Sequence, residues 1–245
     1  MGLWITVSLA LVVTVLVLAL VIYLVVRCKK NQKEQYDREK SFTDIFRQKL
    51  WGSDHPNGEG SLDENTQEDR DALIDVLKKY RINTMLDAPC GLFSWMRRVL
   101  HELPHVDYSG MDIVKDQVEQ NKKHYPSLTF FQGDVSVYPL KKYDLVFSKE
   151  CTQHLKESTT LDFLRNILKS GSTYLLITSF DVPVNSDDNI DPGSPLRNLD
   201  EGAYREQNLL LPPYSDLLVH PMERFFIRKN PYTQTPQYLQ LFRLH

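Results

Sequence analysis

The stretch that decides the fold is Thr84-Met85-Leu86-Asp87-Ala88-Pro89-Cys90-Gly91-Leu92-Phe93-Ser94-Trp95. A short apolar run ends in a carboxylate, passes through a tight Pro-Cys-Gly turn and enters a helical pattern. In open α/β sheets the first strand stops in this way, so that the N-terminus of the next helix faces a ligand. The stretch therefore predicts the first strand, turn and helix of an α/β domain.

Downstream of Thr84 the sequence alternates between strand and helix patterns. Such alternation implies right-handed crossovers and a mainly parallel sheet. Two last apolar segments, Arg224–Arg228 and Tyr238–Leu244, are expected to pair antiparallel at one edge. The other expected strands are at about 84–87, 107–112, 128–132, 143–148 and 173–179, and the expected helices at about 66–80, 92–103, 114–124 and 157–169.

A second apolar run also ends in an acidic residue, Asp112, which lies 25 residues after Asp87. An acidic side chain at the tip of the second strand is well placed to accept hydrogen bonds from ribose hydroxyl groups. The two carboxylates together predict a ligand that contains a nucleoside.

The glycine pattern of the first turn argues against a dinucleotide. A pyrophosphate needs several glycines for close backbone approach, and this turn offers only Gly91. Pro89 also removes a backbone donor. A leading carboxylate such as Asp87 suits a ligand with a cationic amino-acid end, which favours S-adenosyl-L-methionine over a nicotinamide dinucleotide.

Six motifs follow one another along the chain. They are Trp51-Gly52-Ser53 with Gly58–Ser61, Asp87–Trp95, Gly110–Val114, Gly133–Val135, Tyr143–Leu155, and Gly202–Arg205 continuing to Pro213. With these motifs the chain resembles class I S-adenosylmethionine-dependent methyltransferases and, more narrowly, a group with a DAPCG first motif and no assigned substrate. The resemblance spans about residues 42–245 and departs from the group pattern at Leu92, where an acidic residue is usual, and at Lys149-Glu150, where Arg-Asp is usual.

This resemblance implies a Rossmann-like fold, with a mainly parallel seven-stranded sheet and helices on both faces. It also implies roles in binding S-adenosyl-L-methionine. Asp87 and Gly91 are expected at the methionine end, Asp112 with Ile113 at the ribose, and Asp134 with the Val135 backbone at the adenine. Trp51 and Lys149 complete the expected cofactor site, although Trp51 could instead be an ordinary core aromatic.

The exit of the fourth strand is expected to face the transferred methyl group, which places the candidate catalytic residues there. Methyl transfer needs an aligned acceptor atom and sometimes a base. His154 titrates near neutrality in an ordinary environment, so it could accept a proton or could simply be structural. Glu150 is the second candidate and could instead hold the cofactor or a cation on the substrate. Asp181–Gly202 is a long polar loop that could form a lid.

Residues 3–26 are almost wholly apolar. As a helix, 24 residues reach about 36 Å, enough for a hydrocarbon core of about 30 Å. A cleaved signal peptide would need a basic start and a shorter apolar run, so a membrane anchor is favoured. Basic residues follow the span and none precedes it, which predicts a single-pass protein whose C-terminal domain lies in the cytoplasm.

The chain therefore divides into an anchor at 1–27, a charged linker or helical extension at 28–41, and a methyltransferase-like domain at 42–245. Its three cysteines form no metal-site or disulfide pattern. The net charge of −3 gives no reason to expect nucleic acid as a partner. The acceptor, a small molecule or a protein, and the oligomeric state stay open.

Two other function classes remain as alternatives. A non-catalytic binding or scaffold protein could keep the fold, and Leu92 is the residue that favours this alternative. An oxidoreductase that uses a nicotinamide cofactor would need glycines that the first turn lacks.

Overall fold

The computed structural model describes residues 2–52, 55–188, 190, 196, 199, 201–231 and 233–245, with side chains from residue 11 onward. It divides into two compact units, residues 1–40 and residues 41–245. The second unit holds the sheet and all the candidate site residues. Asp191 of the predicted lid lies outside the described residues.

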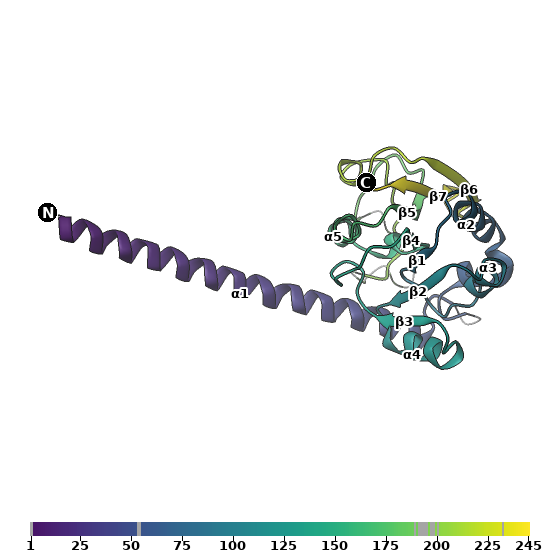
Figure 1. The fold of residues 1–245 in the computed structure, drawn as a ribbon, viewed down its shortest axis with the longest axis horizontal. Coiled ribbons are helices and arrows are strands. Elements are labelled where there is room, and N and C mark those ends of the chain that lie inside the picture. The colour runs from purple at the N-terminus through teal and green to yellow at the C-terminus, as the bar shows by residue number, and fades with distance from the viewer. Residues whose placement is uncertain are drawn as a thin grey trace. The chain divides into compact units, whose positions relative to one another are not determined.

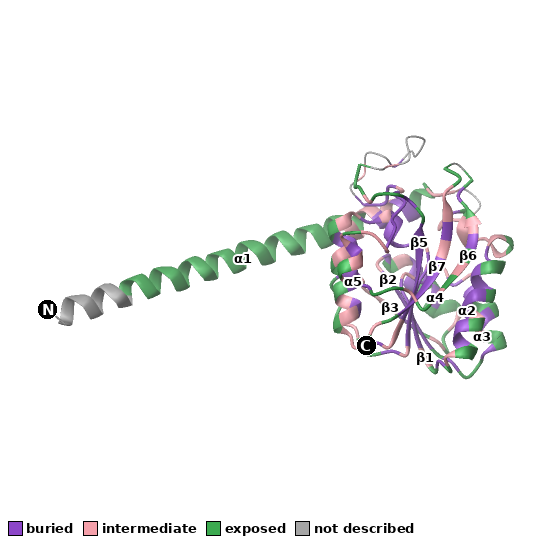
Figure 2. Cartoon of the chain, turned by 90° about the horizontal axis from the view of Figure 1, so that it is seen from above, coloured by how far each residue is buried: buried purple, intermediate pink, exposed green. Residues whose placement is uncertain are grey.

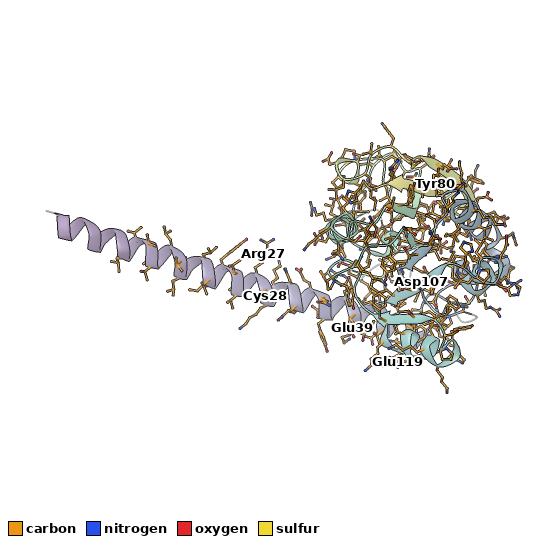
Figure 3. The ribbon with its side chains drawn as sticks, in the orientation of Figure 1. Arg27, Cys28, Glu39, Tyr80, Asp107 and Glu119 are labelled. Carbon is orange, nitrogen blue, oxygen red and sulfur yellow. The ribbon has the colours of Figure 1, made fainter. Side chains whose placement is uncertain are left out.

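The first unit is the greater part of helix α1, which extends from Gly2 to Gln48. Its residues 11–34 are exposed, and Arg27 and Cys28 project from the helix (Figure 3). Within the described residues, α1 is the one helix long and apolar enough to cross a membrane, judged by length and composition. Residues 31–40, which the sequence left open between linker and helix, are helical.

The second unit is built on a seven-stranded sheet with the order β3-β2-β1-β4-β5-β7-β6 (Figure 1). Strands β1 to β5 are parallel, and β7 pairs antiparallel with both β5 and β6. This arrangement confirms the predicted fold class, including the antiparallel edge pair. The strands are β1 Thr84–Asp87, β2 Asp107–Asp112, β3 Thr129–Gln132, β4 Leu145–Ser148, β5 Tyr174–Phe180, β6 Glu223–Lys229 and β7 Pro236–Arg243.

Helices cover both faces of this sheet (Figure 2). Successive strand residues point to opposite faces, so Met85 enters the core shared with α2 and α3 while Leu86 enters the core shared with α5 and the end of α1. Burial on both faces explains the continuous apolar runs of the sequence. The helices are α2 Gln67–Lys79, α3 Met96–Glu102, α4 Lys115–His124 and α5 Glu157–Lys169, and the short 3₁₀ turns are η1 Glu59–Ser61, η2 Asp63–Asn65, η3 Thr152–His154 and η4 Tyr214–Asp216.

One predicted boundary is wrong by a full helical turn. The sequence predicted a helix from residue 92, but α3 begins at Met96. Phe93 has a φ of 56°, a left-handed conformation that no α-helix contains. Its ring packs against Tyr108, Tyr125 and Phe130, with ring centres 4.8–5.4 Å apart. Aromatic packing between helix and sheet thus takes precedence over the helical pattern.

The carboxyl ends of β1 to β4 lie along one edge of the sheet. In the register, Asp87 of β1 faces Gly110 of β2 and Phe147 of β4. The strand order reverses between β1 and β4, and open α/β sheets bind ligands in the crevice at such a switch point. This edge is therefore where the candidate site is expected.

Candidate functional site

A hydrogen bond to the next strand, β2, fixes the conformation of the turn after β1. Gly91 has a φ of 53°, which favours glycine, and its N–H donates to the Asp112 carboxylate at 3.0 Å. Its carbonyl accepts a bond of 2.7 Å from the Asn121 amide on α4. The turn is thus fixed by β2 and α4 before any ligand binds.

Asp112 lies at the tip of β2, as the sequence predicted, but it is buried instead of being open to solvent. Only 4% of the residue is exposed, because its carboxylate turns back to accept hydrogen bonds from the N–H groups of Gly91 and Val114. Burial raises the pKa of Asp112 to about 6, and these backbone N–H groups oppose the rise. Asp112 therefore ties the two strand ends together.

Asp87 is buried as well, at the end of β1. Its carboxylate accepts a hydrogen bond of 2.8 Å from the hydroxyl of Tyr108 on β2. Burial raises the pKa of Asp87 to about 8, since the Tyr108 bond only partly offsets the desolvation of the charge. A cationic ligand placed beside Asp87 would restore the ionised form.

Asp134 follows β3 and is also buried. Its carboxylate accepts from both the N–H and the hydroxyl of Ser136, at 2.9 and 2.7 Å. Val135 and Ile113 are half-buried beside the core on the α5 face. The carbonyl of Val135 accepts from Asn166 on α5 and that of Ile113 from Gln132. The ends of β2 and β3 are thus rigidly supported.

Lys149 and Glu150 form an ion pair at the exit of β4, with Nζ and Oε1 3.2 Å apart. Lys149 also donates to the carbonyl of Gly60 at 2.8 Å, and Gln237 of β7 donates to Glu150. Burial opposes ionisation of Glu150, but the charges of Lys149 and Arg228 outweigh it and lower the pKa to about 2. Glu150 therefore stays a carboxylate, and Lys149 fastens the loop before β1 to this exit.

The absence of a side chain at Gly60 leaves room for the carboxylate of Glu150. A Cβ at this position would lie 2.2 Å from Oε2 of Glu150, so any larger residue would displace the carboxylate. Glu150 itself has a φ of 49°, a strained conformation for a residue other than glycine. Strain of this kind concentrates at functional sites, where the surrounding structure holds it in place.

His154 ends the 3₁₀ turn η3 and lies between two aromatic rings. Its ring centre is 4.6 Å from that of Trp51 and 5.8 Å from that of Tyr204. Burial lowers the pKa of His154 to about 4, although nearby Glu150 raises it. The expectation of titration near neutrality is therefore wrong. Its Nδ1 is buried with no hydrogen-bond partner among the described residues.

Trp51 connects the start of the domain to the segment Gly202–Arg205, at the end of the predicted lid. Its Nε1 donates to the carbonyl of Gly202 at 3.4 Å, and its ring also contacts Phe42. This segment is bound to η3, because the backbone N–H groups of Gly202 and Arg205 donate to the carbonyls of His154 and Gln153. In the described part of the lid, Asp187 accepts from the N–H of Glu157 at the start of α5.

The structure thus brings Trp51 and the predicted residues at the ends of β1, β2 and β4 to one edge of the sheet. The sequence patterns did not indicate three further residues of the candidate site: Asn57, Tyr108 and Gln153. Gln153 Oε1 and Asn57 Oδ1 are buried without hydrogen-bond partners among the described residues. No sequence pattern marks Asn57 and Gln153 as site residues, because a loop and the 3₁₀ turn η3 position them. Within the residues that the structure describes, no group of three or more His, Cys, Asp or Glu could hold a metal ion.

Comparison with known proteins agrees with this geometry. Residues 85–171, which contain the first turn and the exits of β2, β3 and β4, match the methyltransferase domain family. The chain carries a class I S-adenosylmethionine-dependent methyltransferase domain.

Among curated proteins, the domain is similar to the malonyl-[acyl-carrier protein] O-methyltransferase of Paenibacillus sp. (strain JDR-2). The two are 26% identical over 106 residues, which cover 39% of this chain and 38% of that protein. The match thus spans well under half of the relative.

Solved structures share the fold of the methyltransferase domain. Magnesium protoporphyrin IX methyltransferase from Synechocystis PCC 6803, with bound S-adenosylmethionine, has a TM-score of 0.57 at 13% identity, covering 84% of this chain and 97% of that one. Human N-acetylserotonin methyltransferase, in complex with the same cofactor, has a TM-score of 0.53 at 17% identity, covering 82% and 58%. These likenesses show that the domain shares the fold of methyltransferases whose structures contain S-adenosylmethionine as cofactor.

The residues present in the methyltransferase domain fit this cofactor. Carboxylates lie at the ends of β1 and β2, and Gly91, the single glycine of the turn after β1, has no side chain. Among the described residues, Asn57 Oδ1 and His154 Nδ1, on segments near the strand ends, are buried polar atoms without hydrogen-bond partners. A polar ligand would satisfy them, as buried polar groups require.

Proposed function

We propose that the chain is an S-adenosylmethionine-dependent methyltransferase, tethered to a membrane through residues 3–26, that transfers a methyl group to a small molecule or a protein. The observation that carries the proposal is the pairing of Asp87 and Asp112 around the Gly91 turn. Both carboxylates are buried, and buried charges persist where they have partners. A ligand with a ribose and an amino-acid end supplies such partners.

When bound, the cofactor supplies an electrophilic methyl group on a sulfonium. The roles proposed for the chain's own residues follow from their contacts. Asp87 and Gly91 hold the methionine end and Asp112 with Ile113 the ribose, while Asp134 and Val135 contact the adenine. Trp51 covers the site, and Lys149 keeps the covering loop closed through Gly60.

His154 and Glu150 are the proposed catalytic residues. Because burial lowers the pKa of His154 to about 4, its imidazole is neutral at physiological pH and is a weak base. Nδ1 is therefore proposed to accept a hydrogen bond from the acceptor group, and to take its proton only when methyl transfer makes the acceptor atom cationic and acidic. Glu150 remains ionised and would orient an acceptor that carries a positive charge or a hydrogen-bond donor. Such positioning is a large part of the catalysis of a displacement reaction.

The test is calorimetry on the full chain in detergent, titrated with S-adenosylmethionine and then with S-adenosylhomocysteine. Micromolar binding of both is expected, followed by transfer of a labelled methyl group to a component of a cell extract. A folded protein that binds neither ligand would contradict the proposal and favour a non-catalytic scaffold.

Leu92, the residue that favoured a scaffold, has a packing role. It is half-buried and lies against the core on the α5 face. An apolar side chain at this position therefore contributes to the stability of the turn. Leu92→Asp is the variant to compare if the measured affinity for the cofactor is weak.

The proposed membrane location rests on the exposed apolar surface of α1. Its residues 11–26 are exposed and almost wholly apolar, and an apolar patch of this size is unfavourable in water. With the positive flank after the span, the methyltransferase domain is proposed to face the cytoplasm. Retention of the chain in alkali-washed membranes, with the domain open to protease only after cell lysis, is expected; release into the soluble fraction would contradict it.

A further inference from the structure

A loop residue outside the predicted site lies directly over the Gly91 turn. A Cβ built on Gly91 would be 3.3 Å from Cγ and 3.4 Å from Oδ1 of Asn57. Asn57 comes from the segment between Trp51 and η1, more than thirty positions earlier in the chain. The loop before β1 therefore brings a polar side chain against the bare face of the glycine turn.

The Asn57 side chain is held in a defined orientation. Its Nδ2 donates to Oε1 of Gln117 at 2.7 Å, and Gln117 is 2% exposed on α4. The hydroxyl of Ser61 donates to the carbonyl of Asn57 at 3.2 Å, and that of Ser94 donates to the carbonyl of Ser61 at 3.1 Å. These contacts fasten the loop to the turn, so the amide has little freedom to move.

This orientation leaves one atom of the amide unused. Asn57 Oδ1 is buried and has no hydrogen-bond partner among the described residues. A buried acceptor without a donor costs about 1–3 kcal/mol, so a structure that holds one in place implies a donor that is supplied by a ligand. The carboxylate of Asp112, which accepts from the N–H of Gly91, disfavours an anion here and favours a cationic donor.

We propose that Asn57 is a cofactor-binding residue whose Oδ1 accepts a hydrogen bond from the α-ammonium group of the methionine half of the cofactor. Gln117 is then a positioning residue, which keeps the oxygen of the Asn57 amide toward the ligand. This inference rests on the proposed function, because it assumes that S-adenosylmethionine binds at the Gly91 turn.

The test compares two ligands by calorimetry on the full chain in detergent. One ligand is S-adenosylhomocysteine, and the other is its analogue without the α-amino group, with the carboxylate and the adenosine retained. In Asn57→Ala, affinity for S-adenosylhomocysteine is expected to fall about tenfold or more, as the loss of one charge-assisted hydrogen bond predicts. Affinity for the analogue is expected to stay within about twofold, because the analogue lacks the group that the bond requires.

Two further variants give the result its chemical meaning. Asn57→Asp retains an acceptor oxygen and is expected to keep the preference for the ligand with the amino group. Gln117→Leu frees the amide to rotate and is expected to weaken S-adenosylhomocysteine binding selectively, though less than Asn57→Ala does. The matched control is Asn65→Ala on the same loop, where the amide donates to the carbonyl of Glu59 at an exposed position; it should leave both affinities unchanged.

The outcomes separate this inference from the proposed function. If the wild-type chain binds neither ligand, the proposed function fails and Asn57 has no cofactor to hold. If the wild-type chain binds S-adenosylhomocysteine and Asn57→Ala weakens both ligands equally or neither, the cofactor assignment stands and the inference about Asn57 is overturned. Thermal unfolding of each variant, followed by circular dichroism, shows that the comparison concerns folded protein.

Discussion

The backbone N–H of Gly91 donates a hydrogen bond of 3.0 Å to the carboxylate of Asp112. The same carboxylate accepts from the N–H of Val114 at 2.9 Å, so one side chain organises the ends of both β1 and β2. A residue placed in this way supports the fold and the site together. Its loss should therefore be visible in stability as well as in ligand binding.

Asp112→Ala is expected to abolish binding of S-adenosylhomocysteine and to lower the free energy of unfolding by about 1–3 kcal/mol. The reason is that two buried N–H groups lose their acceptor. Thermal unfolding of the full chain in detergent, together with calorimetry, measures both effects.

The matched control for this variant is Asp107→Ala. Asp107 is exposed at the opposite end of the same strand, and its side chain takes no part in the contacts of the site. Both measurements should be unchanged for Asp107→Ala. An Asp112→Ala protein as stable as the wild type would contradict the structural role assigned to the Asp112 carboxylate.

Asp87 should make the ligand-free protein less stable as the pH rises. Burial raises its pKa to about 8 in the folded chain, from 3.8 in the unfolded chain. The folded state therefore holds a proton that the unfolded state releases, and the stabilising contribution, fully present below pH 3.8, is lost as the pH rises to about 8. The slope is up to about 1.4 kcal/mol per pH unit.

Asp87→Asn isolates this contribution, because an amide stays neutral and can still accept the bond from Tyr108. The difference in unfolding temperature between the wild type and Asp87→Asn should shift in favour of the variant from pH 5 to pH 8. A difference that does not depend on pH would show that Asp87 is ionised throughout this range.

The sequence predicted the strand ends well and their surroundings poorly. Asp87, Asp112 and Asp134 follow apolar runs, and that local pattern was enough to place them at one edge of a parallel sheet. The burial of Asp112 was missed, because the bond from Gly91 joins residues that are separated by a helix and a strand. Asn57 and Tyr108 were missed for a related reason: their importance comes from a loop and an aromatic cluster that form only when the chain is folded. The start of α3 was wrong because the packing of Phe93 outweighs a helical pattern.

Lys149→Met should destabilise the protein by about 3 kcal/mol, since removing one partner of a buried ion pair leaves the other charge uncompensated. Lys149 is the more deeply buried partner, with 6% of its side chain exposed against 24% for Glu150. The double variant Lys149→Met, Glu150→Gln should recover most of the loss, because no unpaired carboxylate remains. Chemical denaturation of the four proteins in this cycle measures the coupling.

A coupling near zero in that cycle would mean that Arg228 and Gln237 alone satisfy Glu150. Lys149→Met should also loosen the loop before β1, because the bond to the Gly60 carbonyl is lost. Faster proteolysis between residues 52 and 62 than in the wild type is the expected sign. The exposed pair Lys122 and Glu119 offers the control, since Lys122→Met should change stability by less than about 1 kcal/mol.

His154 should be neutral throughout the physiological range and should gain a proton only near pH 4, because burial lowers its pKa from 6.5 to about 4. The stability that follows from a lowered histidine pKa is present above pH 6.5 and is lost as the pH falls toward 4, since the unfolded chain takes up the proton first. NMR titration of the imidazole signals, with the His154 signal assigned from its absence in His154→Gln, measures this directly. The same variant should bind S-adenosylhomocysteine as the wild type does, while slowing methyl transfer by about a hundredfold if Nδ1 accepts the proton. A signal that titrates near pH 6.5 would show that the ring is solvated, and an undiminished rate would make His154 a structural residue between Trp51 and Tyr204.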